Sequence, residues 1–376
     1  MRVLIVGGGI GGLALAVALE RRGIAADLIE RRPAYGPEGA GVVLGANVMA
    51  ALRPLGLTEA VTAAGAEVTQ AEITDVNGHQ LQRTDFGFPD LPPAVAIHRS
   101  ALQQVLLGAL AQRPLLGTTL QSYQITPEGA EATRSDGVQT RYDLIVGADG
   151  LRSALRADIA GPIEPRYSGY TCWRFVVPLP FKQGVTEMWG PGKRVGVVPI
   201  GGGKVYVFLT ANAPQRAPAP FEDDIGLHQE FAMFGDPGKA AIEALRGLEG
   251  VLHNDIEDCL CPRWWAPRRV LIGDAAHAVT PNMGQGAGLA IEDAVALAAL
   301  LAAEGPGDAT LARFEALRKP RAAFIHQRSW DFGRVAQWRS APMIWLRNRL
   351  FALTPPSVGQ KALEAVVRDM PGVPTC

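Results

Sequence analysis

At 376 residues the chain is long enough to bury a large core, and its length suggests two domains. Its 36 basic and 37 acidic residues give a formal net charge of −1, which argues against nucleic acid or anionic membranes as general partners. A hydrophobic content of 48% and a charged content of 19% are typical of a soluble globular protein.

Cysteine usage and apolar runs narrow the class further. Four cysteines do not make a disulfide framework, and Cys259-x-Cys261 has no second pair at zinc-ligand spacing, so we predict no metal site. No apolar run reaches the ~18 residues of a membrane span. The first strand begins beside the initiator methionine, which leaves no room for a signal peptide. We therefore expect a cytoplasmic protein without a membrane partner, as a monomer or homodimer.

The first motif joins a strand to a helix. Val3–Val6 is a short apolar run, which predicts a buried parallel strand. Gly7, Gly9 and Gly12 follow it in the pattern G-x-G-x-x-G. The first glycine allows a tight turn, the second lets the backbone approach a pyrophosphate, and the third lets the helix pack against the strand. The alternative is a tight strand–helix turn without a ligand.

An acidic residue completes this motif. The predicted helix runs from Ile10 to about Arg22, and Ala26–Ile29 forms the next strand. Glu30 ends that strand, 18 residues after Gly12, where a carboxylate would bond a ribose 2′-hydroxyl. The same carboxylate disfavours the 2′-phosphate of NADP. The motif therefore predicts a bound dinucleotide but does not distinguish FAD from NAD.

Two features follow whose roles the sequence leaves open. The glycine-rich segment 36–45 is either a loop that brings backbone to a ligand or a flexible connector. Residues 66–97 alternate as short strands, with Asn77-Gly78 as a hairpin turn. Arg99 stands at the entry of the next helix, where it either holds a phosphate or is a solvated charge.

Two further buried strands end in glycine and an acid. The run 142–146 leads into Asp149-Gly150, and the run 270–272 leads into Gly273-Asp274. Asp149 could instead simply cap the following helix. Glycines at 284–288 begin a long helix, so several backbone N–H groups there are free to face an anion.

The pattern changes between residues 165 and 261. Short strands at 172–177, 186–189, 194–199 and 205–210 alternate with Pro/Gly turns, which predicts a mostly antiparallel sheet inserted into the nucleotide fold. A turn-rich linker at 214–220 precedes a helical segment at 221–246. After residue 303 the chain is mostly helical to Val367, and we expect breaks at Pro320, Pro342 and Pro355-Pro356.

Together the motifs Gly7-x-Gly9-x-x-Gly12, Asp149-Gly150 and Gly273-Asp274 resemble those of the single-component FAD-dependent aromatic hydroxylases. These are the para-hydroxybenzoate hydroxylase-like flavoprotein monooxygenases, and the chain looks most like their salicylate- and urate-hydroxylase-like branches. The resemblance implies an α/β fold: a Rossmann-type FAD-binding domain (1–70, 95–164 and 262–320), an inserted mostly antiparallel β-sheet substrate domain (71–94 and 165–261) and a C-terminal helical segment (321–376).

The resemblance also implies roles for individual residues. Glu30 and Arg31 look like the pair at the adenosine ribose, Arg99 like the arginine on the phosphates, and Asp274 like the acid on the ribityl chain or pyrophosphate. His277 has no settled role, and we expect it to be structural. The implied cofactor-binding residues are Gly7, Gly9, Gly11, Gly12, Glu30, Arg31, Val43, Arg99, Leu120, Asp149, Asp274, Gly284, Gln285, Gly286, Ala287 and Gly288.

Arg194 and Tyr206 are the candidate catalytic residues. They match the order and spacing of an arginine and a tyrosine that flank the substrate in urate hydroxylases, but both could equally be strand residues packed inside the sheet. The segment 170–174, Tyr-x-x-Trp-Arg, is similar to a strand of the pocket wall in these hydroxylases.

The resemblance implies a monooxygenase that uses FAD, NADH or NADPH, and O2 to hydroxylate a small aromatic or heteroaromatic substrate through a flavin C4a-hydroperoxide. The absence of a second G-x-G-x-x-G fits a family in which the nicotinamide cofactor has no Rossmann domain of its own. Two alternatives remain open: a related FAD oxidoreductase or halogenase that inserts no oxygen, and a flavin-binding redox sensor.

Overall fold

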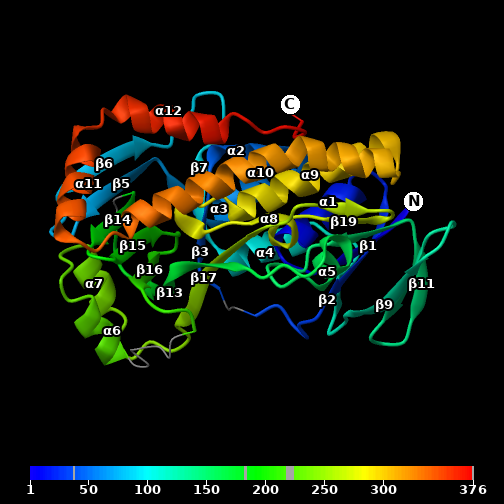
Figure 1. The fold of residues 1–376 in the computed structure, drawn as a ribbon, viewed down its shortest axis with the longest axis horizontal. Helices are drawn as coiled ribbons and strands as arrows, with labels where there is room; N and C mark the ends of the chain where they lie inside the picture. The colour runs from blue at the N-terminus through cyan, green and yellow to red at the C-terminus, as the bar shows by residue number, and fades with distance from the viewer. Residues whose placement is uncertain (37–38, 182–183, 217–223, 375–376) are drawn as a thin grey trace.

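The computed structural model describes residues 1–36, 39–181, 184–216 and 224–374. Figure 1 shows an elongated molecule with the N-terminal strands and first helix toward one end. A larger antiparallel sheet lies toward the other end, and one long helix runs along both parts.

The first part is built on a six-stranded sheet in the order β18-β19-β12-β1-β2-β8. Every neighbouring pair is parallel except β18 with β19. The central strands are apolar and largely buried, as expected for a parallel sheet covered on both faces. The strands are β1 (Arg2–Val6), β2 (Ala25–Glu30), β8 (Leu115–Leu116), β12 (Leu144–Gly147), β18 (Trp265–Ala266) and β19 (Arg269–Leu271).

Two small antiparallel sheets adjoin this core. One has the order β11-β10-β9 and the other the order β3-β7-β4. Their strands are β9 (Leu120–Ile125), β10 (Ala130–Arg134), β11 (Gln139–Tyr142), β3 (Gly41–Leu44), β4 (Ala66–Val68) and β7 (Ala94–His98).

Helices surround the sheets and complete the C-terminal part. In the first part they are α1 (Ile10–Glu20), α2 (Ala46–Ala51), η1 (Arg53–Leu55), α3 (Thr58–Ala64), α4 (Arg99–Gly108) and α5 (Ala154–Ala160). Later in the chain they are α6 (Asp224–Glu230), α7 (Gly238–Glu243), α8 (Asp274–His277), η2 (Pro281–Met283), α9 (Gly286–Glu304), α10 (Asp308–Ala336), α11 (Ala341–Leu353) and α12 (Pro356–Val367).

The second part is a seven-stranded sheet in the order β17-β13-β16-β15-β14-β5-β6. All of its neighbours are antiparallel except β14 with β5. The hairpin β5–β6 joins this sheet although it precedes the other five strands by about 80 residues, so the sheet is assembled from two segments of chain. The strands are β5 (Gln70–Asp75), β6 (Gln80–Asp85), β13 (Arg166–Pro178), β14 (Val185–Gly190), β15 (Lys193–Pro199), β16 (Lys204–Asn212) and β17 (Leu252–Leu260).

The two faces of this sheet differ in character. One face carries Trp173, Phe175, Val195 and Leu209, which are buried in a core with residues of α6 and α7. Because side chains alternate along a strand, the residues between them point to the other face. That second face carries both candidate catalytic residues.

Three expectations from the sequence need correction. The segment 36–45 is not all loop, because it contains strand β3, which pairs with β7. The helix predicted over 221–246 is two short helices, α6 and α7, while 217–223, which include most of the predicted linker, lie outside the described residues. Pro320 does not break the C-terminal helices, since it lies inside the 29-residue α10. Arg318 and Arg321 are buried on either side of it and bonded to α9, which holds the helix through the proline.

The long helix predicted after residues 284–288 is α9, and its residues 288–298 and 301 are buried. It is the one described helix that is long and apolar enough to cross a membrane, but 67% of its 18-residue apolar window, whose mean hydropathy is 1.7, is buried inside the protein. It also carries Glu292 and Asp293, which are fully buried and paired with arginines of α10. It is therefore the core helix of the first part.

Candidate functional site

The glycines between β1 and α1 form an open cradle. A β-carbon at Gly7 would lie 2.4 Å from the Ala148 carbonyl oxygen, and one at Gly12 only 1.9 Å from the Gly7 carbonyl oxygen, so both positions require glycine. A β-carbon at Gly9 would meet nothing within 4 Å. Open space at the middle glycine, between two tightly packed ones, fits a ligand phosphate that approaches the backbone.

Glu30 lies at one end of this cradle. One carboxylate oxygen accepts a 2.7 Å hydrogen bond from the Gly8 amide, and the other accepts a 2.9 Å bond from the Arg32 amide. The Tyr35 hydroxyl is buried beside Gly8 and has no hydrogen-bond partner in the part of the chain that the structure describes. Burial, followed by the Glu30 charge, raises the pKa of Tyr35 to about 12. A buried polar atom without a partner at this point fits an adenosine ribose. Arg31 is exposed next to it, and Leu120 begins β9, partly buried against the main core.

One carboxylate oxygen of Asp149 has a structural role, and the other is unpaired within the described ranges. Its Oδ2 accepts a 2.9 Å hydrogen bond from the Ala154 amide, which caps the start of α5. Its Oδ1 is buried and has no partner among the described residues. The predicted capping role is therefore present, and the second oxygen remains available to a ligand.

Asp274 and Arg99 lie close enough to affect each other's charge. Both side chains are exposed, yet the surrounding protein desolvates them: it raises the pKa of Asp274 and lowers that of Arg99, and each charge partly opposes this effect on the other. Both side chains thus reach the surface at a point that neighbouring protein atoms partly enclose. The neighbouring charges of Arg32 and Arg174 make this region positive. An anionic cofactor would be attracted to it.

Residues 284–288 place a second helix start next to that of α1. Gly284 has a left-handed backbone (φ 62°), Gln285 is the N-cap residue, and Gly286, Ala287 and Gly288 form the first turn of α9. A β-carbon on Gly11 would lie 3.2 Å from Ala290, so α1 and α9 pack closely near their N-termini. The nearest atom to a β-carbon on Gly284 would be the Val43 carbonyl oxygen, at 3.8 Å. The free N–H groups of both helix starts can therefore face one extended anionic ligand.

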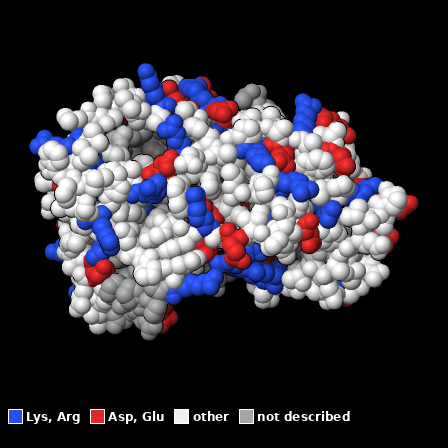
Figure 2. Space-filling view, in the orientation of Figure 1, with Lys and Arg blue, Asp and Glu red and all other residues white. Residues whose placement is uncertain are grey.

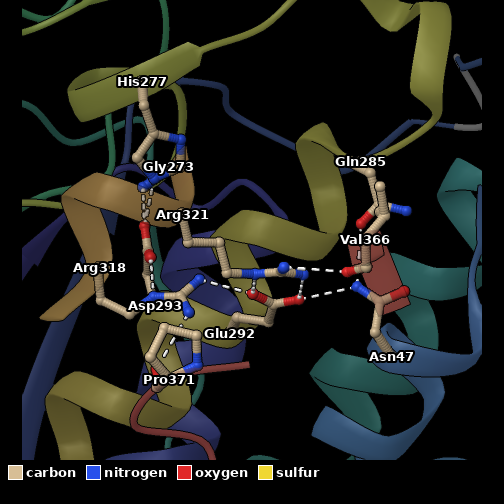
Figure 3. A network of polar contacts seen from close by, with 10 residues as sticks. All are labelled: Asn47, Gly273, His277, Gln285, Glu292, Asp293, Arg318, Arg321, Val366 and Pro371. Atoms are coloured by element: carbon tan, nitrogen blue, oxygen red, sulfur yellow. Dashed lines mark hydrogen bonds and ion pairs between the residues drawn. The ribbon is translucent and has the colours of Figure 1, made fainter. Parts of the chain in front are cut away.

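A fully buried network of charges supports this loop (Figure 3). Glu292 accepts hydrogen bonds from Arg321 at 2.6 and 2.7 Å, from Arg318 at 2.7 Å and from Asn47 at 2.8 Å. Asn47 also donates to Gln285 at 2.9 Å. The network therefore joins α2, α9 and α10 directly behind the start of α9.

Asp293 extends the network to the Gly273-Asp274 turn (Figure 3). It accepts from the Gly273 amide at 3.0 Å and from Arg318 at 2.9 Å, and it contacts His277 Nε2 at 2.5 Å. Burial alone would raise the pKa of Asp293, but the charges of His277 and Arg318 hold it well below the usual range. In this structure His277 anchors the turn from behind.

Tyr206 lies where the seven-stranded sheet meets β3. A β-carbon on Gly41 would lie 2.4 Å from the Tyr206 side chain, so the ring rests directly on that glycine. Phe208 lies beside it, with ring centroids 5.9 Å apart, and Val43 and Val198 belong to the same apolar cluster. Burial raises the pKa of Tyr206, so its hydroxyl is neutral and suited to donate a hydrogen bond, not to act as a base.

Arg194 lies on the same face but is already paired. Its guanidinium donates to Glu187 at 2.9 Å, to Asn282 at 2.9 Å and to Thr210 at 3.2 Å. It pairs with Thr210 across the strands, four residues from Tyr206, which is roughly 14 Å along a strand. The structure thus places the two candidate catalytic residues apart on one sheet face. Tyr206 has apolar surroundings, and Arg194 has polar ones.

Several residues of this site belong to no recognisable sequence pattern. Asn282 accepts from both Arg194 and the Tyr170 hydroxyl, and its amide donates to Ser329 of α10. The Asn282 side chain fits against α10 because residue 333 is a glycine: a β-carbon there would lie only 2.3 Å from the Asn282 side-chain nitrogen. A lone asparagine in a loop has no recognisable pattern, and its partners lie 47 to 112 residues away. Glu187, Asn47 and Glu292 were missed for the same reason. Within the described ranges no group of His, Cys, Asp and Glu could hold a metal ion.

Comparison with known proteins now identifies the fold. Residues 1–329 match the family model described as "FAD binding domain". The chain belongs to the FAD-dependent aromatic monooxygenases. It is 41% identical to the aurachin C monooxygenase/isomerase of Stigmatella aurantiaca and 35% identical to the 2-heptyl-3-hydroxy-4(1H)-quinolone synthase of Pseudomonas aeruginosa, with 94% of both chains covered in each case.

Solved structures agree with this assignment. A variant of HpxO from Klebsiella pneumoniae complexed with FAD superposes with a TM-score of 0.90 at 25% identity and covers 99% of both chains. A salicylate hydroxylase substrate complex gives a TM-score of 0.80 at 21% identity over 98% of this chain and 95% of that one, which supports the fold alone. The α/β fold with its inserted sheet is thereby confirmed.

Proposed function

We propose that this enzyme uses NADH or NADPH and O2 to hydroxylate a small heteroaromatic ring while FAD lies in the cradle. The proposal rests on one arrangement. The starts of helices α1 and α9 and the unpaired Asp149 oxygen lie on one side, and the apolar sheet face that carries Tyr206 lies on the other. A polar cofactor site next to a dry pocket is what oxygen transfer to an aromatic ring requires. We place the enzyme in the cytoplasm, where the nicotinamide cofactor is produced.

Each part of the cradle has a proposed task. The glycines from Gly7 to Gly12 and Arg99 would hold the phosphates of FAD. Glu30, Arg31 and Leu120 would hold its adenosine end. Asp149 and Asp274 would hold the groups between the adenosine and the flavin ring. When bound, FAD supplies the redox chemistry and activates O2. The N–H groups of residues 284–288 would face negative charge on the ring system next to Val43, and a helix start contributes roughly 0.3–2 kcal/mol to such a contact.

The substrate that we propose is a 4(1H)-quinolone or a similar flat bicyclic ring. The names of two relatives, at 41% and 35% identity, refer to aurachin C and to such a quinolone. An apolar lining with one neutral hydroxyl donor suits a ring of this kind, because Tyr206 can donate to its carbonyl oxygen and polarise it. Arg194 is neutralised by Glu187, so it contributes less to binding a carboxylate such as salicylate. In this proposal Arg194 positions Asn282 and the cofactor loop.

The division into domains is part of the same proposal. Residues 1–70, 95–164 and 262–320 would form the cofactor domain, and 71–94 with 165–261 would form the substrate domain. Strands β5 and β6 lie in the sheet with β13 to β17, which supports placing 71–94 with the substrate.

The test is turnover of the FAD-loaded protein with labelled O2. A 2-alkyl-4(1H)-quinolone, salicylate and urate would each be added with NADH or NADPH, and flavin reduction and labelled product would be measured. We expect the quinolone to accelerate reduction and to gain one labelled oxygen. Tyr206→Phe should lower the rate about 100-fold while bound FAD is retained. Peroxide as the only product with every substrate would instead indicate an oxidoreductase without oxygen insertion.

A further inference from the structure

Helix α11 presents an apolar face to solvent. The only fully buried side chain of this helix is that of Arg347. Trp345 is 63% exposed and Leu353 is 75% exposed, values unusual for such large apolar side chains. In Figure 1 the helix lies at the end of the molecule formed by the seven-stranded sheet. The exposed apolar residues of α11 and the start of α12 are Met343, Trp345, Leu346, Leu350, Leu353 and Val358.

Four of these residues form one stripe along α11. Residues at positions i, i+3, i+7 and i+10 of a helix share a face, and Met343, Leu346, Leu350 and Leu353 have this spacing. A surface helix of a globular protein normally directs its polar residues outward, whereas here the apolar stripe points outward. Several large apolar side chains exposed together mark an interaction surface.

The helix is firmly attached by its inner face. Phe351 packs edge-on against Trp189, with ring centroids 4.9 Å apart. The Arg347 guanidinium lies 5.0 Å from the same ring and donates a 2.9 Å hydrogen bond to the Ala336 carbonyl oxygen. The outward stripe is therefore a property of the packed fold, since the inner face of the helix already packs against Trp189 and the end of α10.

The charged residues of the chain segment that carries this stripe all have one sign. Residues 332–363 contain five cations and neither aspartate nor glutamate, although the whole chain has a net charge of −1. Figure 2 shows mostly uncharged surface at this end of the molecule, with scattered blue side chains and fewer red ones. The exposed cations of the segment are Arg334, Arg339, Arg349 and Lys361.

We propose that α11 and the start of α12, residues 341–358, dock on a bilayer that contains anionic phospholipid. An exposed apolar stripe and an exposed tryptophan on one helix, in a segment whose charges are all cations, have the composition of a helix that lies in the membrane interface. A second copy of this chain fits less well, because two copies of the same cationic face would bring like charges together. The sequence-based expectation of no membrane partner averaged the charge over the whole chain, which hides this local excess. The proposal does not depend on the proposed reaction, since vesicle binding needs no turnover.

The test is flotation of the FAD-loaded full chain with vesicles. The vesicles are phosphatidylcholine alone or phosphatidylcholine mixed with phosphatidylglycerol, at ionic strengths of about 0.1 M and about 1 M. We expect flotation with the anionic vesicles and weaker flotation in high salt. The double variant Leu350→Glu/Leu353→Glu should partition at least about tenfold less. Both residues are exposed, and retained FAD absorbance would verify that the variant folds.

Ile225→Glu is the matched control, because Ile225 of α6 is also 63% exposed but lies outside the stripe. It should float like the unmodified protein. Failure of the unmodified protein to float with anionic vesicles, or equal flotation of the double variant, would overturn the proposal. Sedimentation showing a dimer that the double variant dissociates would also overturn it, in favour of a second copy as the occupant.

Discussion

Replacing Glu292 by glutamine isolates the contribution of the buried charge network. The substitution keeps the size of the side chain but removes its charge, and an amide group then faces donors from Arg318, Arg321 and Asn47. Arg318 retains Asp293 as a counter-charge, whereas Arg321 retains only the Val366 carbonyl oxygen (Figure 3).

The magnitude follows from the burial of Arg321. Its side chain is 1% exposed in the ion pair with Glu292, so solvent cannot replace the lost counter-charge. Breaking a buried pair by removing one partner costs about 3–5 kcal/mol of unfolding free energy. That equals roughly a 100- to 4000-fold change in the folding equilibrium and is a large part of the stability of a typical protein.

Urea unfolding followed by circular dichroism measures the effect. Glu304→Gln is the control, because Glu304 pairs with Arg313 at the surface, where side-chain exposures are 32% and 65%. Surface pairs contribute about 0–1 kcal/mol, so this control should unfold close to the unmodified protein. If Glu292→Gln unfolded at the same urea concentration as Glu304→Gln, the network would not stabilise the fold and the reasoning would be wrong.

Three further outcomes are expected. Gly41→Val would place a β-carbon 2.4 Å from the Tyr206 β-carbon and 2.5 Å from the first ring atom, so the ring must move; we expect turnover about 100-fold lower with FAD still bound, and unchanged steady-state kinetics would contradict this. Arg99→Ala removes a charge near Asp274 and should weaken FAD binding by about 1.5–3 kcal/mol in a fluorescence titration, while equal affinity would exclude Arg99 from the site. The pKa of Asp293 is held low in the folded state although burial alone would raise it, so its contribution to stability is present above about pH 4 and is lost as the pH falls further. Asp293→Asn should therefore show a flatter decline of stability below about pH 4 than the unmodified protein, as measured by urea unfolding at a series of pH values.

The cofactor cradle was predictable because local geometry dictates its residues. The backbone at Gly7 and Gly12 leaves no room for a β-carbon, so the spacing of glycines records the turn directly. The buried strands and the Asn77-Gly78 turn between β5 and β6 were predictable for the same reason, since period and turn chemistry are local.

Contacts that are distant in sequence were not predictable. Glu292 and Arg321 are 29 residues apart, and a proline lies between Arg321 and its neighbour Arg318. The proline rule predicted a break there because it considers only the local backbone, while the two buried arginines hold the helix intact. Arg194 was recognised by its position, but its pairing with Glu187 depends on which face each strand presents, and a single sequence does not give that facing.

The structure ties residues 273–288 down at three separate points. Asp293 accepts from the Gly273 amide at the beginning, Asn282 accepts from Arg194 in the middle, and Asn47 donates to Gln285 at the end. Asp293 and Asn47 belong to helices around the six-stranded sheet and Arg194 belongs to the seven-stranded sheet, so the loop is fixed relative to both parts. Backbone N–H groups stabilise a developing charge only if they already point at it before the charge appears. The buried network and the Arg194 contact therefore have a common consequence: the start of α9 is held in place for the cofactor by side chains that need not touch the substrate.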